Sequence, residues 1–335
     1  MKIVVDAFGG DNAPLEIVEG AVDAIRRNPE LEVILCGKEQ AIKEILNGRD
    51  ERIEIVDAQD VVLNTDHPTE AIRKKKDSSL VRAYDVLKER EDVVGLVSAG
   101  STGAILAGAI MKIGRIKGIS RPALAPILPT KKDNDVLMVD SGANVDCKPV
   151  NLLHFALMGS AYYSIIYGVK NPRVALLSNG SEEGKGNELV KETYPLLQAA
   201  PVNFIGNKEG GDYMSGDVDV MVADGFAGNA LLKGSEGAVN AVISVLKNSI
   251  KSHFSSKIGY LLMKKTFKEL RDRIDIIGKH AGSPLLGCKK LVVKNHGSCK
   301  RNNIRASIEQ TMKLHENHLI EEIESSLAKL NITEE

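Results

Sequence analysis

The chain contains no tryptophan, and aromatic residues make up only 4% of its 335 positions. Proteins that bind single-stranded nucleic acid stack bases on aromatic side chains, so this scarcity argues against such a function. An excess of one charge is also lacking, because 44 lysines and arginines nearly balance 45 acidic residues and leave a net charge of −1. A dedicated nucleic-acid binder would be strongly basic. We therefore expect no nucleic-acid partner for this globular composition.

Cysteine is scarce and scattered, at Cys36, Cys147, Cys288 and Cys299. No pair has the C-x-x-C spacing of a zinc or redox site, so we expect reduced thiols and no bound metal. Long apolar runs are missing as well. Asp6 interrupts the apolar start of the chain, and no segment reaches the roughly 18 apolar residues that cross a bilayer. The sequence predicts a cytoplasmic protein with at most peripheral membrane contact.

Short runs rich in valine, isoleucine and leucine alternate with helical patterns along the chain. Nearly continuous apolar strands of this kind are typical of a mostly parallel sheet that helices cover on both faces. The sequence therefore predicts the α/β class, with a three-layer α/β/α sandwich. The predicted strands are residues 2–6, 31–36, 53–56, 93–98, 136–140, 173–178, 218–224 and 291–294.

No linker rich in proline, glycine or serine divides the chain, so residues 1–335 are predicted to form one compact unit of two packed lobes. Residues 238–277 stand apart, because this long segment has no strand signal. It is predicted to fold as a protruding hairpin of two helices broken near residues 255–259.

Apolar side chains gather at two places in this predicted hairpin. Residues 258–262 are unusually apolar for a helical tip, which predicts contact with a membrane surface. In the second helix Met263, Phe267, Leu270 and Ile274 recur on one face, and we expect this stripe to pack against a second copy of the chain.

Glycines and small polar residues follow five of the predicted strands. The carboxyl ends of parallel strands meet at one edge of a sheet, where helix N-termini offer N–H groups to anions. Five such loops together predict one shared anion-binding site. Its candidate substrate-binding residues are Asp6, Gly9, Gly10, Asp11, Ser98, Gly100, Ser101, Thr102, Gly103, Asp140, Asn144, Asp224 and Gly225.

Two familiar phosphate-binding motifs are nearly present. A dinucleotide fingerprint on Gly100 and Gly103 would need glycine in place of Ser98, which argues against an ordinary nicotinamide-dependent dehydrogenase. A Walker A loop ending at Lys185 would need serine or threonine in place of Gly186, so ATP hydrolysis is not expected. These loops predict no cofactor.

Three residues are candidates for catalysis. Lys185 lies between two glycines before a predicted helix, where an ammonium group could approach an oxyanion. Asn229 begins another predicted helix and carries an amide donor at any working pH. His296 follows the last predicted strand and is the best-placed histidine for moving a proton. A solvated loop lysine and a plain helix cap remain alternatives for the first two.

Several segments in this order resemble the signature blocks of the PlsX family of bacterial acyl-ACP:phosphate acyltransferases. The segments are VDAFGGDNAP, SAGSTGA, SNGSEEGKGNELVKE, VADGFAGNALLK, HAGSPLLG and VVKNHGS, and they cover nearly the whole chain. The resemblance implies transfer of a fatty acyl group from acyl carrier protein to inorganic phosphate. The product would be acyl phosphate for phospholipid synthesis. It also implies a homodimer with a fold like that of isocitrate and isopropylmalate dehydrogenases and phosphotransacetylases.

The implied carrier protein is acidic, so we expect it to dock on a basic surface. Residues 73–76 form one candidate surface, and the second comprises Lys264, Lys265, Lys268, Arg271 and Arg273. Two other functions stay open. A dehydrogenase or decarboxylase of the related fold would need arginines for a dicarboxylate, which we do not find. A non-catalytic scaffold on the membrane would need only the hairpin.

Overall fold

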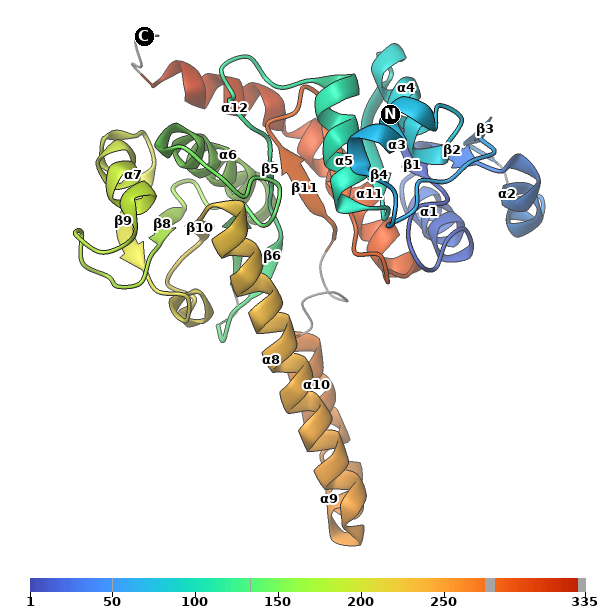
Figure 1. The fold of residues 1–335 in the computed structure, drawn as a ribbon. Helices are drawn as coiled ribbons and strands as arrows, with labels where there is room; N and C mark the ends of the chain where they lie inside the picture. Colours follow the sequence, from blue (N-terminus) through green and yellow to red (C-terminus); the bar gives the residue numbers. More distant parts are fainter. Residues whose placement is uncertain (50, 133, 275–280, 331–335) are drawn as a thin grey trace.

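The computed structural model describes residues 1–49, 51–132, 134–274 and 281–330, whose strands form two sheets lying side by side (Figure 1). The seven-stranded sheet has the order β3 (Ile53–Asp57), β2 (Glu32–Gly37), β1 (Lys2–Asp6), β4 (Val93–Ser98), β12 (Leu291–Lys294), β11 (Ser283–Leu286) and β5 (Ala123–Leu124). The five-stranded sheet has the order β6 (Ile127–Pro129), β7 (Asp135–Val139), β10 (Val220–Val222), β8 (Arg173–Leu177) and β9 (Asn203–Lys208). Both are mainly parallel, with antiparallel pairing at β11 and β6.

Helices cover both faces of the seven-stranded sheet. Ile3 and Val5 of β1 point to the face under α1 (Leu15–Arg27), α2 (Glu39–Leu46) and α11 (Arg301–Glu316). Val4, between them, points to the opposite face, under α3 (Pro68–Lys74), α4 (Ser79–Glu89) and α5 (Thr102–Gly108). Successive side chains of a strand alternate between faces, so burial on both sides explains the continuous apolar runs.

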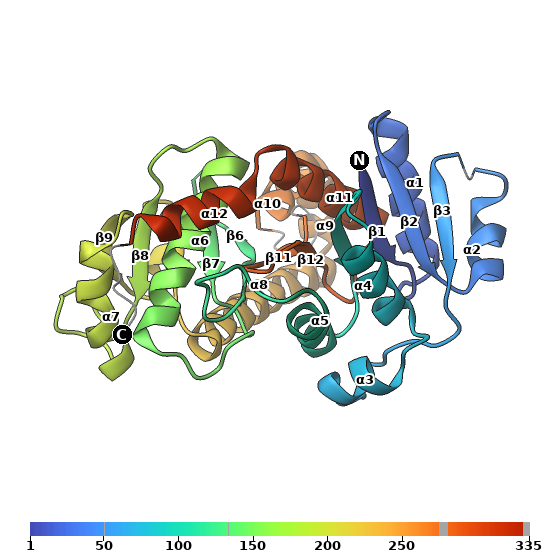
Figure 2. The same cartoon turned by 90° about the horizontal axis from the view of Figure 1, so that it is seen from above.

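The five-stranded sheet is layered in the same way. Its inner face packs on α6 (Pro149–Tyr167), α7 (Glu188–Ala199) and α12 (Leu319–Ala328), and its other face packs on the start of α8 (Gly225–Ser252). Two sheets with helices on both faces confirm the predicted α/β/α architecture. Seen from above, α12 continues from α11 across the molecule toward α6 (Figure 2).

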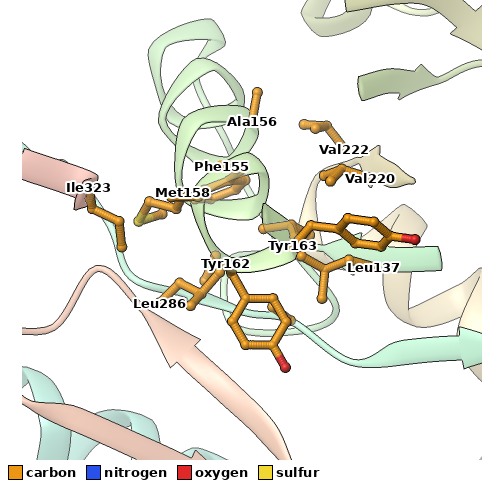
Figure 3. Close-up of a cluster of buried hydrophobic side chains, with 14 of the residues drawn as sticks. Leu137, Phe155, Ala156, Met158, Tyr162, Tyr163, Val220, Val222, Leu286 and Ile323 are labelled. Atoms are coloured by element: carbon orange, nitrogen blue, oxygen red, sulfur yellow. The ribbon is translucent and has the colours of Figure 1, made fainter. Parts of the chain in front are cut away.

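Helix α6 is the hydrophobic centre that joins the two sheets. Phe155, Met158 and Tyr162 are buried together with Val220 of one sheet and Leu286 of the other (Figure 3). Each such side chain stabilises the fold by about 1.5–3 kcal/mol when it is fully buried. One apolar cluster therefore holds parts of both sheets against a single helix.

A helical hairpin projects from the body, as predicted, but its break lies elsewhere (Figure 1). Helix α8 ends at Ser252, and α9 (Phe254–Leu262) and α10 (Lys264–Ile274) lead back toward the sheets. The break predicted near residues 255–259 falls inside α9, and the helices are interrupted on either side of it, at His253, where the chain is extended, and at Met263. A glycine weakens a helix by only about 1 kcal/mol, so it need not interrupt one.

Helix α8 starts at Gly225, is buried on the body as far as Leu232 and Ser235, and continues without interruption past residue 238. Residues 275–277 of the predicted segment lie outside the described residues. Across the described ranges, no helix is both long and apolar enough to cross a membrane.

The first turn of α8 packs directly on the chain that follows β7. A Cβ atom on Gly228 would collide with the main-chain carbonyl oxygen of Asp140. By contrast, a Cβ atom on Gly234, less than two turns further along α8, would meet no atom within 4 Å. Only the first of these glycines is required by packing.

We expect Gly228→Ala to lower the free energy of unfolding by about 1–3 kcal/mol, because the added methyl group forces the two segments apart. Gly234→Ala is the matched control and should raise the same free energy by about 0.4–1 kcal/mol. Urea denaturation of both variants measures the difference. A Gly228→Ala protein as stable as the control variant would contradict the close contact seen here.

Candidate active site

A cavity of about 530 Å³ lies where loops from both sheets meet the first turns of α8. The seven-stranded sheet contributes the segments that follow β1, β4 and β12, and the five-stranded sheet contributes the segment after β7. The polar and charged residues on its wall include Asp11, Ser101, Thr102, Ser141, Asn229, Lys233, Glu236, Lys294, Asn295 and His296. An opening at the carboxyl ends of parallel strands is where α/β proteins bind ligands.

The structure brings six of the candidate residues from the sequence to this one cavity. They are Asp11, Gly100, Ser101, Thr102, Asn229 and His296. Asn229 is not a helix cap, because Asp224 caps α8 by accepting a hydrogen bond from the Ala227 N–H at 2.8 Å. The Asn229 side chain instead lies against Gly142 on the cavity wall.

Asp6, Ser98 and Gly9 shape the loops behind the wall rather than forming it. The buried Asp6 carboxylate accepts a hydrogen bond from Ser98 Oγ at 2.7 Å, and Ser98 Oγ accepts one from the Gly100 N–H at 3.1 Å. A Cβ atom on Gly9 would collide with the same carboxylate. Burial raises the pKa of Asp6, while its hydrogen bonds act in the opposite direction. These contacts fix the position of Gly100.

Asp140, Asn144 and Gly225 likewise hold loops together. The Asp140 carboxylate accepts hydrogen bonds from the N–H groups of Leu124 at 2.8 Å, Ser141 at 2.7 Å and Asn144 at 2.6 Å. The Gly225 N–H donates to the Asn144 carbonyl oxygen at 2.7 Å. Burial raises the pKa of Asp140, although these N–H donors favour the ionised form. With its oxygens bonded to protein, this carboxylate supports the wall from behind.

The remaining glycines among the candidates also serve packing. A Cβ atom on Gly10 would press against Ala99, and one on Gly103 would press against Pro68 of α3. Neither glycine is part of the cavity wall. Gly10 and Gly103 therefore allow close approach of chain segments, whereas Gly100 lines the cavity.

Lys185 is separated from the other two catalytic candidates. It lies in the exposed loop between β8 and α7, where its N–H donates to the Glu182 carbonyl oxygen at 3.1 Å. Its neighbours Gly186 and Asn187, together with Asp224, line a second cavity of about 490 Å³ instead. Lys185 and Asp224 are therefore not among the residues that line the cavity with Asn229 and His296.

Two lysines that the sequence analysis did not select face the first cavity. Lys294 is half-buried, and its ammonium group has no hydrogen bond or ion pair within the described ranges. Burial lowers its pKa, as does the positive charge of Lys233. Lys233 is paired with Glu236 at 2.8 Å. The Glu236 carboxylate acts on the pKa of Lys294 in the opposite direction, but a partly buried lysine without a direct ion pair is a candidate for binding an anion.

The sequence carried a signal for both lysines. Asn229, Lys233 and Glu236 are spaced by four and three residues, which places them on one face of a helix. Lys294 and His296 are two apart at the end of a strand, where alternate side chains point to the same side. Both lysines could therefore have been found by asking which residues share a helix or strand face with the candidates Asn229 and His296.

The ring of His296 is held by hydrogen bonds to its Nδ1. Its Nδ1 accepts a hydrogen bond from the Ser298 N–H at 3.3 Å and lies 2.8 Å from Ser298 Oγ. Burial lowers the pKa of His296, and the charges of Lys294 and Lys233 lower it further. With Nδ1 used as an acceptor, the proton of the neutral ring lies on Nε2. That N–H is available to an oxygen anion.

Comparisons with known proteins agree on the family. A family model described as "Fatty acid synthesis protein" matches residues 1–322. The phosphate acyltransferase of Clostridium tetani is 45% identical and covers 98% of this chain and 99% of its own length. That of Clostridium acetobutylicum is also 45% identical and covers 99% and 100%. The chain belongs to the PlsX family of phosphate acyltransferases. The resemblance found in the sequence is confirmed.

A solved structure supports the fold of this acyltransferase. A phosphotransacetylase from Streptococcus pyogenes aligns with a TM-score of 0.58 over 97% of this chain and 94% of its own. The identity is 17%, so the likeness shows a shared fold. The predicted likeness to the phosphotransacetylase fold is thereby confirmed, and family membership favours an acyltransferase over both a dehydrogenase and a non-catalytic scaffold.

We expect Lys294→Met to lower kcat/KM for acyl transfer by about 100-fold or more, because the cavity of this acyltransferase loses a partly buried cation. Lys185→Met is the matched control, and its exposed position predicts a change of less than about threefold. Steady-state kinetics of the two variants decides between the lysines. If Lys185→Met loses most of its activity while Lys294→Met remains active, Lys185 in the loop after β8 is the lysine that interacts with the oxyanion.

Proposed function

We propose that this protein transfers a fatty acyl group from acyl carrier protein to inorganic phosphate and releases acyl phosphate for phospholipid synthesis. The observation that carries this proposal is the unpaired Lys294 beside His296 and Asn229 in one cavity at the strand ends. The relatives are named phosphate acyltransferases, which supports phosphate as the acceptor. A fatty acyl group agrees with the description of the matching family.

Phosphate would bind between Lys294 and the segment after β4. Ser101 and Thr102 supply hydroxyl groups there, and Thr102 is the first residue of α5, where main-chain N–H groups are unpaired. The Lys294 ammonium offsets the charge of the anion in a partly buried environment, where electrostatic attraction is stronger than in water. Binding in this way also orients a phosphate oxygen toward an incoming thioester.

Acyl transfer is then a direct displacement. A phosphate oxygen forms a bond to the thioester carbonyl carbon, and the C–S bond breaks with its electron pair on sulfur. The thiolate of the carrier protein takes a proton from water. Negative charge grows on the carbonyl oxygen during the attack, and the His296 Nε2–H and the Asn229 amide are the donors placed to stabilise it. The neutral state of His296 suits this task.

The first experiment is incorporation of labelled inorganic phosphate into acyl phosphate from purified acyl carrier protein substrates. We expect the label in a lipid-soluble product whose formation requires both phosphate and the thioester. Acyl-coenzyme A is the control donor and tests whether the carrier protein is needed. Loss of the thioester at the same rate without phosphate, or label that never enters an acyl product, would overturn the proposal.

The hairpin is the proposed contact for the carrier protein. Lys264 and Lys268 are exposed on α10 without an ion pair among the described residues, and Lys265 lies 3.9 Å from Glu269. In residues 73–76, by contrast, Lys74 lies 2.8 Å from Glu70 and Lys75 lies 2.7 Å from Asp66. The less neutralised α10 surface is therefore the one we favour for an acidic partner. Arg273 belongs to the same surface and donates to the Lys131 carbonyl oxygen at 3.0 Å, while the side chain of Arg271 lies outside the described residues.

A homodimer and a peripheral membrane contact at the inner face of the membrane complete the proposal. Met263 and Leu270 of the predicted stripe are 51% and 46% exposed in the single chain, which leaves apolar surface for a second copy. Phe267 is half-covered and lies 5.2 Å from Tyr260, measured between ring centres, and the side chain of Ile274 lies outside the described residues. Leu261 and Leu262 are 69% and 83% exposed near the far end of the hairpin.

We expect the double variant Leu261→Glu/Leu262→Glu to lose most of its co-sedimentation with anionic liposomes, because charged side chains do not enter the apolar part of a bilayer. Val145→Glu is the control, since Val145 is 61% exposed on the body of the protein and not on the hairpin. Size-exclusion chromatography checks the oligomeric state of both. If the double variant sediments like Val145→Glu, the membrane contact lies elsewhere.

A further inference from the structure

Two residues that line the first cavity each have a buried side-chain polar atom with no hydrogen-bond partner. These atoms are Oγ of Ser141 and Nδ2 of Asn295, and neither has a partner among the residues that the structure describes. Ser141 is 3% exposed and follows β7 of the five-stranded sheet, while Asn295 is 2% exposed and follows β12 of the seven-stranded sheet. Both residues are part of the cavity wall.

The position of the Asn295 side chain is set from behind. Its main-chain N–H donates to the Ser98 carbonyl oxygen at 2.8 Å, and its Oδ1 lies 2.9 Å from Ser307 Oγ, whose single proton is shared with the Asn303 carbonyl oxygen at the same distance. Ser307 Oγ in turn accepts a hydrogen bond from the Gly282 N–H at 2.6 Å. The side-chain carbonyl group of Asn295 thus has a hydrogen-bond partner in the protein. Its Nδ2 has none among the described residues.

Ser141 is fixed just as firmly in the segment after β7. Its N–H group donates to the Asp140 carboxylate at 2.7 Å and to the Leu124 carbonyl oxygen at 3.0 Å. The following Gly142 has a φ of 108° and lies beside the side chain of Asn229. The main chain of Ser141 is anchored, while its Oγ has no hydrogen-bond partner among the described residues.

Buried polar groups nearly always have partners, because leaving one unpaired destabilises the folded state. An unpaired donor at the wall of a cavity is explained when a ligand supplies the acceptor. Both unpaired groups here can donate, and the partly buried Lys294 next to Asn295 in the chain adds a positive charge. Donors and a cation together select an oxygen-rich anion.

We propose that Asn295 and Ser141 are substrate-binding residues that donate hydrogen bonds to the tetrahedral phosphate anion, each from a segment that follows a strand of a different sheet. The inference rests on the proposed function in taking inorganic phosphate as this anion. Neither residue was a candidate from the sequence. Because the two donors come from different sheets, bound phosphate would connect the two sheets across the cavity.

The chain offers matched controls for both residues. Ser178 also has a buried Oγ without a partner, but it lines the second cavity. Asn207 is 2% exposed with an unpaired Oδ1 and belongs to neither cavity wall, and its Nδ2 donates to the Glu182 carbonyl oxygen at 2.9 Å. Substitutions at these positions remove the same chemical groups at places where the anion does not bind.

The experiment is titration calorimetry of the full chain with inorganic phosphate alone. We expect Ser141→Ala and Asn295→Ala to raise the dissociation constant for phosphate by about tenfold each, since each loses a hydrogen bond to a charged ligand. Ser178→Ala and Asn207→Ala should stay within about twofold of the unmodified protein. The melting temperature without phosphate shows which variants are folded.

Asn295→Asp keeps the proposal testable should Asn295→Ala fail to fold. Aspartate retains an oxygen that accepts the hydrogen bond from Ser307, but it replaces the unpaired donor by a negatively charged acceptor. We therefore expect it to weaken phosphate binding by more than tenfold. Phosphate affinities in the cavity variants equal to those of the two controls would overturn the proposal, as would a folded, unmodified protein that does not bind phosphate.

The same measurement separates this inference from the proposed reaction. Tenfold weaker phosphate binding in the two cavity variants, in a protein that forms no acyl phosphate, would support the binding residues and reject the acyl transfer. Acyl phosphate formation with unchanged phosphate affinity in both variants would support the reaction and reject the two residues.

Discussion

The buried carboxylate of Asp140 holds the two sheets in one fixed relation at the cavity. It ends the β7 segment of one sheet and accepts the N–H of Leu124 in β5 of the other sheet. It also accepts the N–H groups of Ser141 and Asn144, and the Asn144 carbonyl oxygen accepts the first N–H of α8. A hydrogen bond to a charged acceptor stabilises by about 1.5–3 kcal/mol, comparable to burying a whole leucine side chain. Asp140 thereby positions both the segment after β7 and the start of α8 at the cavity.

The strands and layers could be predicted because a strand that is buried on both faces has a nearly continuous apolar sequence. All eight predicted strands form, within a few residues. The strands that were not predicted are β5, β6, β9 and β11. Three of them are two to four residues long, and β6 and β11 contain proline. The fourth, β9, lies at a sheet edge and is mostly half-buried, so its apolar pattern is weak.

The location of the site was easier to predict than the task of each residue in it. Glycine and polar residues after strands mark the correct edge of the sheet, and six candidates reach the cavity. The sequence does not reveal whether a loop carboxylate faces the ligand or bonds the loop itself, and Asp6 and Asp140 do the latter. That distinction depends on which segments pack together over more than 80 residues of separation, as Asp6 and Ser98 do.

Helix α8 connects the cavity with the far end of the hairpin in one rigid piece. It begins at Gly225 beside Asp140, carries Asn229 and Lys233 in its first turns and ends at Ser252 after 28 residues. At 1.5 Å per residue the helix is about 42 Å long, so a tilt of about one degree at its base moves the far end by about 0.7 Å. A displacement of the far end of the hairpin likewise tilts the base of α8 at the cavity. Whatever holds the hairpin in place also limits the angle at which Asn229 and Lys233 meet the substrate.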